Sequence, residues 1–143
     1  AMFGYVVTIM RLPNELVEAV LEIGASPITF IIAVMVVIFI LGMFLETIAI
    51  ILITTPIIFP VMLELGINPI WYGILLMINL ELALITPPVG MNLFVIKGIS
   101  GANLDAIIRG IFPYVLLMVL GLIIVMVVPE TATWLPKAAG FGR

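Results

Sequence analysis

The sequence contains no cysteine and no histidine, and only 9% of its 143 residues are charged. Without cysteine the chain can hold no disulfide, thiol nucleophile or thiolate zinc site. Without histidine it lacks the most common acid–base catalyst and metal ligand. The net charge of −3 and the five basic residues argue against nucleic-acid binding. We therefore expect no enzyme, no transition-metal site, no organic cofactor and no nucleic-acid partner.

Apolar residues are present in great excess. They make up 65% of the sequence, and the mean hydropathy is +1.47. A soluble domain has roughly 45–50% apolar and about 25% charged residues, and a chain of this size cannot keep such an excess out of water. The composition therefore predicts an all-α membrane protein whose solvent is lipid.

The first 25 residues predict two short elements. The chain begins with Ala1 rather than methionine, inside an apolar run over residues 1–10. We interpret this run as the end of a membrane helix cut from a longer protein. Glu15, Glu18 and Glu22 share one face of an expected helix over residues 13–24, which is amphipathic and too short to span a bilayer.

The apolar run over residues 26–63 carries one charge, Glu46. It is longer than the about 20 residues that a spanning helix needs, so it must turn. A turn at residues 42–47 leaves arms over 27–41 and 47–63. At about 1.5 Å per residue the arms are about 22–26 Å long, shorter than the roughly 30 Å hydrocarbon core. These lengths predict a re-entrant helical hairpin over 27–63 with its tip at 42–47.

Two alternatives to this hairpin stay open. If residues 28–45 formed a simple spanning helix, Glu46 would lie at an ordinary membrane interface. A turn at Thr54-Thr55-Pro56 would give very unequal arms. We expect a proline kink there instead, with threonine hydroxyls bonding to the carbonyls that the proline frees.

A second interruption is predicted at residues 86–90, within a helical run over 69–97. Its sequence is Thr86-Pro87-Pro88-Val89-Gly90. Two prolines remove two backbone donors and clash with the preceding turn, and the residue before each is disfavoured in the helical region. We therefore expect a broken helix, with Thr86 capping the part that restarts and Asn92 just inside it.

Residues 98–143 predict a polar connection and one last span. The connection is expected over 97–109, the span over 110–128 with Pro113 in its first turn, and a polar or interfacial tail after it with Trp134 in the interfacial belt. If Lys97 and Arg109 follow the positive-inside tendency, their loop is cytoplasmic and the hairpin enters from outside. The basic residues near the two chain ends oppose this orientation.

The two interruptions are the candidate functional site. Irregular backbone at membrane depth is tolerated only where it is buried in protein or lines a wet cavity. The carbonyl ends of half-helices attract cations, and their N–H ends attract anions. Glu46, Thr47 and Thr86 add side-chain oxygens, a ligand set that suits a hard ion such as Na⁺. Asn92 could donate a hydrogen bond to an anionic substrate.

Simpler interpretations of these residues also stand. Asn79 and Glu81 could form hydrogen bonds between helices instead of binding substrate, although Asn79 remains a candidate substrate ligand beside Asn92. The break at Thr86 could be a packing kink. A structural or assembly subunit without transport activity is the alternative function, and it predicts dry or lipid-facing interruptions. A channel would need a ring of polar residues along one helix face, which we do not find.

Several motifs in the chain resemble the large membrane subunit of TRAP (tripartite ATP-independent periplasmic) transporters. They are Gly42-Met43-Phe44-Leu45-Glu46, Thr55-Pro56 with Pro60, Leu65-Gly66-Ile67-Asn68-Pro69, Tyr72-Gly73-Ile74, Asn79-Leu80-Glu81, and the run from Leu84 through Thr86-Pro87-Pro88-Val89-Gly90-Met91-Asn92 to Val95. The resemblance implies the second inverted repeat of an elevator-type secondary transporter driven by Na⁺. Residues 26–97 would form half of its transport domain, and 98–143 the connection, the final scaffold helix and the tail.

The same resemblance implies a site and a set of partners. One Na⁺ site would be formed by tip and break residues together: Gly42, Glu46, Thr47, Thr86, Pro87, Pro88, Val89 and Gly90. The substrate would be a small carboxylate, such as a C4-dicarboxylate or sialic acid, delivered by a periplasmic binding protein. A small four-helix membrane subunit and the N-terminal repeat of the same permease would complete a multi-pass assembly in the bacterial inner membrane. A single repeat holds half the cavity, so this chain alone should not transport.

Overall fold

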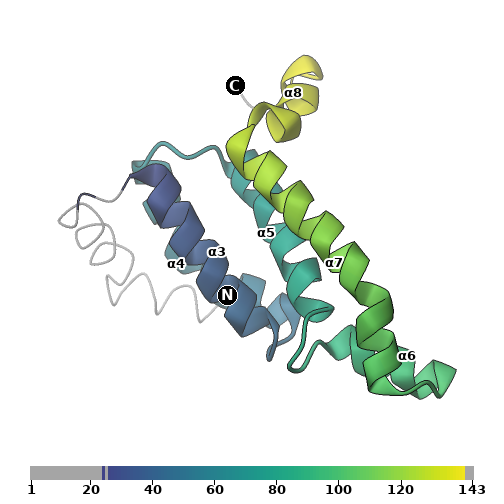
Figure 1. Cartoon of the computed structure of the whole chain (residues 1–143). Helices are drawn as coiled ribbons and strands as arrows, with labels where there is room; N and C mark the ends of the chain where they lie inside the picture. The colour runs from purple at the N-terminus through teal and green to yellow at the C-terminus, as the bar shows by residue number, and fades with distance from the viewer. Residues whose placement is uncertain (1–23, 25, 141–143) are drawn as a thin grey trace.

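A computed structural model describes Gly24 and residues 26–140 of the chain. This part forms six α-helices and contains no strand (Figure 1). The membrane-helix end expected over 1–10 and nearly all of the amphipathic helix expected over 13–24 lie outside the described residues. For residues 26–140, the all-α fold class is confirmed.

The first two helices form the expected helical hairpin. They are α3 (Pro27–Gly42) and α4 (Thr47–Glu64), which differ from the predicted arms by one residue at their C-terminal ends. Ser26 caps α3, because its hydroxyl accepts a hydrogen bond from the N–H of Thr29 at 3.3 Å. Glu46 adopts an extended backbone with φ −70° and ψ 143°, which separates the tip from α4.

Helix α4 continues through Pro56 and Pro60, so the rival turn at Thr54–Pro56 is not formed. The hydroxyl of Thr54 donates to the carbonyl of Ile50 at 2.8 Å. We expected a threonine to bond to the carbonyl that Pro56 frees, which belongs to Leu52, and this detail is wrong. A threonine in a helix reaches the carbonyl four residues before itself rather than before the proline.

A tight turn leads into the broken helix. Gly66 has φ +68°, and the N–H of Ile67 bonds to the carbonyl of Met62 at 2.9 Å, which together close α4 as a Schellman motif. Asn68 then caps α5 (Pro69–Leu84) by accepting from the N–H groups of Ile70 and Trp71 at 2.8 and 3.2 Å.

The interruption lies where the double proline predicts it. Helix α5 ends at Leu84 and α6 (Met91–Ser100) follows, so residues 85–90 are non-helical. The expectation that Thr86 caps the second part is wrong, because Gly90, at φ 47°, is the N-cap of α6. The Thr86 hydroxyl instead bonds backwards to the carbonyl of Leu82 at the end of α5.

The C-terminal part is more helical than expected. Helix α7 (Leu104–Val127) begins six residues before the predicted span, and α8 (Glu130–Ala138) forms within the predicted tail. Pro113 lies inside α7 rather than in its first turn. The polar stretch predicted as a connection is mostly helix, because residues 97–100 end α6 and residues 104–109 begin α7. Asp105, in the first turn of α7, interacts favourably with the positive end of the helix dipole.

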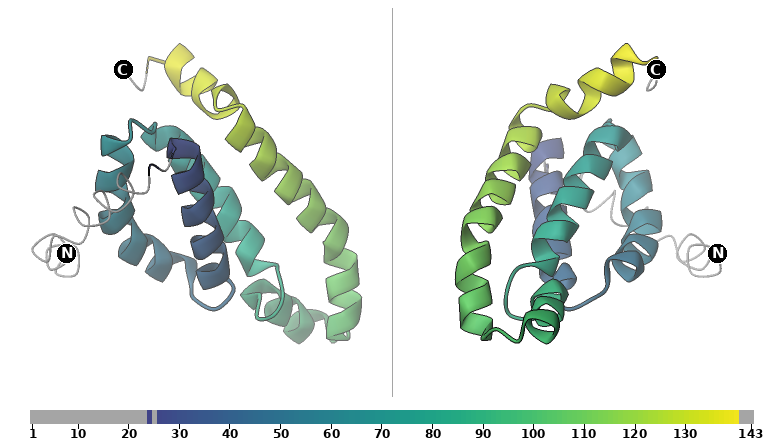
Figure 2. Two further views of the ribbon diagram at one scale, coloured as in Figure 1. Left: turned by 60° about the vertical axis from the view of Figure 1, so that its left-hand side comes forward. Right: turned by 90° about the vertical axis from the view of Figure 1, so that its right-hand side faces the viewer.

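Helix α5 occupies the centre of the arrangement. It packs against α3 and α7 most extensively and also contacts α4, α6 and α8, and Figure 2 shows α3 and α7 beside it in two views. The indole N–H of Trp71, near the start of α5, donates to the carbonyl of Val125 near the end of α7 at 2.7 Å. Helix α7 has no fully buried residue, so most of its surface faces outward.

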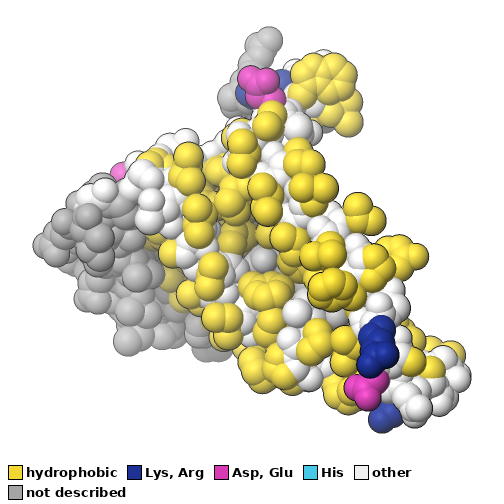
Figure 3. All heavy atoms as spheres, viewed as in Figure 1, with side chains coloured by type: hydrophobic (Ala, Val, Ile, Leu, Met, Phe, Trp, Pro, Cys, Tyr) yellow, Lys and Arg dark blue, Asp and Glu magenta, His cyan; other side chains and the backbone are white. Residues whose placement is uncertain are grey.

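The distribution of side chains fits a bilayer. Helices α4 and α7 are long and apolar enough to cross a membrane. In Figure 3 the visible face of α7 is hydrophobic along its length, and charged side chains gather near its two ends. Helices α3 and α5 have 16 residues each, about 24 Å, which is less than the roughly 30 Å core.

Candidate ion-binding site

The hairpin tip and the helix break lie side by side at the same end of α3 and α5 (Figure 2). Gly42, the last residue of α3, is buried. A Cβ atom added to Gly42 would lie 2.7 Å from the Cβ of Ala83, in the last turn of α5. Gly42 is the first residue of the tip, and the non-helical break begins two residues after Ala83. One close contact between two helices therefore sets the positions of both interruptions.

The tip provides a carboxylate, a hydroxyl and backbone carbonyls. Glu46 is exposed, and its side chain makes no capping hydrogen bond. Thr47 is half-buried at the first position of α4. The N–H groups of Met43, Phe44 and Leu45 bond back to α3. Within residues 26–140 their own carbonyls accept no backbone hydrogen bond, so the described part of the chain leaves them as candidate ligands.

The break brings two backbone carbonyls close to Gly90. A Cβ atom on Gly90 would lie 2.9 Å from the oxygen of Thr86 and 3.3 Å from the oxygen of Leu84. Pro88, whose peptide bond with Pro87 is cis, has no N–H to donate to Leu84 four residues earlier. Gly90 is required here twice, for its positive φ and for the space that its missing side chain leaves. Two backbone carbonyl oxygens therefore lie close to Gly90.

The Thr86 side chain points back along its own helix. Its hydroxyl donates to the carbonyl of Leu82 at 2.6 Å. A hydroxyl has one donor and two acceptor lone pairs, so the oxygen can still coordinate a cation or accept another hydrogen bond. Pro87 and Pro88 are exposed, while Val89 is half-buried and Gly90 is buried. Thr86 is half-buried, and residues 87–90 run from the surface into the interior.

The structure separates the two candidate substrate ligands. Asn92 is half-buried in the first turn of α6, directly after the break. Asn79 is only 2% exposed and lies about two turns before the break, where its side-chain nitrogen donates to the carbonyl of Met35 in α3 at 2.9 Å. Asn79 therefore makes the interhelical hydrogen bond that was its alternative interpretation, and Asn92 is the candidate that lies at the break.

Sequence reasoning missed Ala83. Its small side chain lets Gly42 approach α5, so that α3 and α5 meet where both are about to end. The available signal was a small residue one turn before the double proline, in an otherwise bulky run Leu80-Glu81-Leu82-Ala83-Leu84-Ile85. Such a position permits close helix approach in a membrane.

These features define a helical membrane protein in which two interrupted helices meet at one end of the bundle. Residues 1–131 match the family model of the tripartite ATP-independent periplasmic transporter DctM component. The chain belongs to this family, and the resemblance seen in its motifs is confirmed. The family consists of transporter permeases rather than enzymes.

Curated relatives are similar over nearly the whole chain. The C4-dicarboxylate TRAP transporter large permease protein DctM of Pseudomonas aeruginosa is 43% identical over 97% of this chain and 33% of its own length. The sialic acid TRAP transporter large permease protein SiaM of Vibrio cholerae is 30% identical over 99% of the chain and 33% of its length. The isethionate TRAP transporter permease protein DctMQ of Oleidesulfovibrio alaskensis is 35% identical over 89% of this chain and 20% of its own length. The chain therefore spans about a third or less of these relatives.

Proposed function

We propose that this chain is the second inverted repeat of a TRAP permease and supplies half of an ion-coupled transport site. In this proposal α3 and α4 form a re-entrant hairpin, α5 and α6 a broken helix, and α7 part of a static scaffold. The close approach of Gly42 to Ala83 carries the proposal, because it places the tip beside the break. Helix α3, at about 24 Å, is too short to cross the roughly 30 Å core.

The proposed coupling ion is Na⁺. The oxygens available at the tip and the break are backbone carbonyls, two threonine hydroxyls and the Glu46 carboxylate. Hard cations take such oxygen ligands. The positive end of the α4 dipole would oppose a cation at the tip, and the charge of Glu46 offsets it. The donor set therefore fits Na⁺, with Gly42, Glu46 and Thr47 on one side and residues 86–90 on the other.

The proposed substrate is a small organic acid. Relatives are named for C4-dicarboxylates, sialic acid and isethionate, which are all anions. Asn92 and the first N–H groups of α6 would present donors and a positive dipole end to such an anion. A periplasmic binding protein would deliver the substrate, and a small four-helix membrane subunit would complete the importer in the bacterial inner membrane, which the permease crosses several times.

The missing half of the site would come from the N-terminal repeat of the same permease. A pair of inverted repeats places two hairpins and two broken helices around a substrate at the bilayer midplane. The alternative, a structural or assembly subunit, predicts that changing the oxygens at the break leaves uptake unaffected. Uptake by the full-length permease distinguishes the two.

Replacing Thr86 by alanine in the full-length permease should weaken the dependence of uptake on Na⁺. Loss of one oxygen ligand costs about 1–3 kcal/mol, so we expect the half-saturating Na⁺ concentration to rise about tenfold. Thr86→Ser keeps the hydroxyl and should stay close to the parent. The measurement is uptake of labelled substrate into proteoliposomes across a Na⁺ titration. An unchanged Na⁺ dependence in Thr86→Ala would count against this residue as a ligand.

A further inference from the structure

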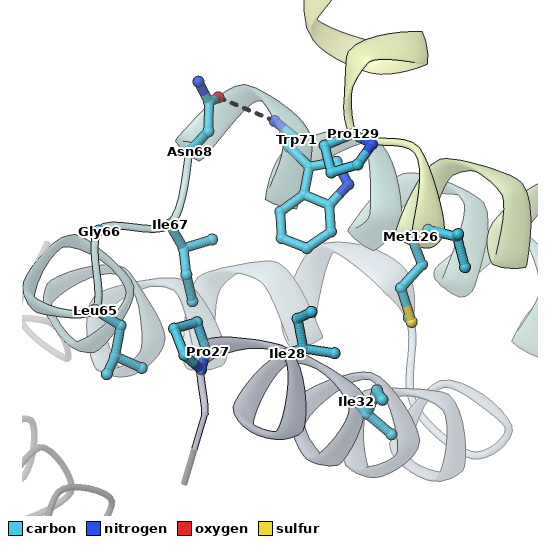
Figure 4. A pocket seen from close by; sticks show the side chains of 11 residues that line it. Pro27, Ile28, Ile32, Leu65, Gly66, Ile67, Asn68, Trp71, Met126 and Pro129 are labelled. Carbon is cyan, nitrogen blue, oxygen red and sulfur yellow. Dashed lines mark hydrogen bonds between the residues drawn. The ribbon is translucent and has the colours of Figure 1, made fainter.

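Two adjoining hollows lie between α3 and α7, the first at the end of the bundle opposite the hairpin tip and the second extending from it towards the tip, as far as Phe39 and Leu82. The first has a volume of about 570 Å³ and is lined by the start of α3, the α4–α5 turn and the end of α7 (Figure 4). The second, of about 370 Å³, lies between α3, α5 and α7, further along α3 towards its C-terminal end. Both are lined by Ile32 and Met126. The two hollows therefore form one groove, which we call the α3–α7 groove.

The α3–α7 groove is polar at one end and apolar at the other. The outer hollow is lined by Asn68 and Trp71 as well as apolar residues. Asn68 uses its side-chain oxygen to cap α5, and its amide nitrogen forms no hydrogen bond within residues 26–140. In the inner hollow Asn79 is the one polar residue among those that line it, and its amide nitrogen already bonds to Met35. Such a gradient matches an amphipathic molecule with its polar part outward.

The dimensions match one leaflet of a bilayer. Along α3 the lining runs from Pro27 to Phe39, which is about 18 Å at roughly 1.5 Å per residue. Half of the roughly 30 Å hydrocarbon core is about 15 Å. Elsewhere on α7, outside the groove lining, Leu116, Leu120 and Ile123 are exposed.

We propose that the α3–α7 groove binds one acyl chain of a bilayer phospholipid. The glycerol–phosphate region would lie at the α4–α5 turn, where the amide of Asn68 donates to a phosphate or ester oxygen. The chain would run inward past Ile32 and Met126 and end beside Asn79. The headgroup end of the site lies at the opposite end of α3 from the hairpin tip, and lipid binding needs no ion, so its occupancy is measurable apart from transport.

The first test blocks the groove with a bulky side chain. Ile32 lines both hollows and is 45% exposed, whereas Val37, 55% exposed on the same helix, lines neither. Native mass spectrometry of the full-length permease titrated with phosphatidylglycerol should show one retained lipid in the parent and in Val37→Trp. Ile32→Trp should retain about tenfold less. Equal retention in Ile32→Trp, or no retained lipid in the parent because another part of the permease fills the groove, would overturn the proposal.

The second test changes the polar end without changing the fold. Asn68→Asp keeps the oxygen that caps α5 and replaces the amide donors with a negative charge that repels phosphate. Retention of phosphatidylglycerol should fall severalfold while the thermal unfolding temperature stays that of the parent. If Asn68→Asp unfolds at the same temperature as the parent and retains as much lipid, the headgroup does not lie at this end of the groove.

Discussion

Replacing Gly90 by alanine should reduce Na⁺-coupled uptake by the full-length permease by about 10–100-fold. The added Cβ would lie 2.9 Å from the carbonyl oxygen of Thr86 and 3.3 Å from that of Leu84, at a residue with φ +47°. Strain of this kind costs about 1–3 kcal/mol. The methyl group would also lie 3.0 Å from Cδ1 of Leu93, whose side chain can move, whereas relief of the 2.9 Å contact requires movement of the backbone carbonyl of Thr86, which we assign to the ion. Uptake into proteoliposomes as a function of Na⁺ concentration measures the effect.

Gly101 provides the matched control for this prediction. It has φ +67° at the end of α6, and a Cβ there would meet nothing within 4 Å. Gly101→Ala therefore introduces similar backbone strain without touching the break. It should lower thermal stability slightly and leave the Na⁺ dependence intact. Equal losses of coupling in both variants would show that general strain, rather than displacement of the Thr86 and Leu84 carbonyls, explains the Gly90 result.

Gly42→Ala should lower uptake about tenfold or more, because the new methyl group would lie 2.7 Å from the Cβ of Ala83. Overpacking of this kind costs about 1–3 kcal/mol, and each 1.4 kcal/mol is about a factor of ten. The added methyl group would push α3 away from α5 and so separate the tip from the break. Intrinsic helix propensity favours alanine over glycine by about 1 kcal/mol, so a loss of activity must come from the lost approach. Initial uptake rates at saturating Na⁺ measure it.

Ala83→Gly should rescue Gly42→Ala. In the double variant the methyl group is moved from α5 to α3 and the two helices can approach again, so uptake should recover to within severalfold of the Ala83→Gly variant. Gly73→Ala, also in α5 but with nothing near its added Cβ, controls for glycine substitution in general. If the double variant were as inactive as Gly42→Ala alone, the contact between α3 and α5 would not be what positions the tip.

The sequence predicted the two interruptions because local chemistry determines them. A run of apolar residues too long for one helix must turn, and Glu46 marks the place where a turn meets water. Two consecutive prolines stop a helix wherever they occur. The hairpin helices and the gap at residues 85–90 accordingly agree with expectation within a few residues.

The start of α7 could not be predicted in the same way. Charged residues between Lys97 and Arg109 suggested a loop, but a helix can continue beyond the apolar core once its side chains reach water. Pro113 was expected in a first turn, where its missing N–H has no cost. In the structure it lies inside α7. Prolines are tolerated within membrane helices because other groups compensate for the missing hydrogen bond.

Contacts between residues that are distant in the chain could not be predicted from the sequence either. The approach of Gly42 to Ala83 and the hydrogen bond from Asn79 to Met35 join residues more than 40 positions apart. Helix periodicity shows which side chains share a face, but in a chain that is apolar all round it does not show which face meets which neighbour. The cap at Gly90 was missed because α6 begins only at Met91, so Gly90 and not Thr86 directly precedes its first N–H groups.

Hydrogen–deuterium exchange of the full-length permease, with and without Na⁺, tests most directly whether the tip and the break hold one ion together. Na⁺ should slow exchange in peptides covering residues 42–47 and 86–92 at the same half-saturating concentration, and K⁺ at equal ionic strength should slow neither. Protection of only one stretch, or equal effects of Na⁺ and K⁺, would contradict a shared site.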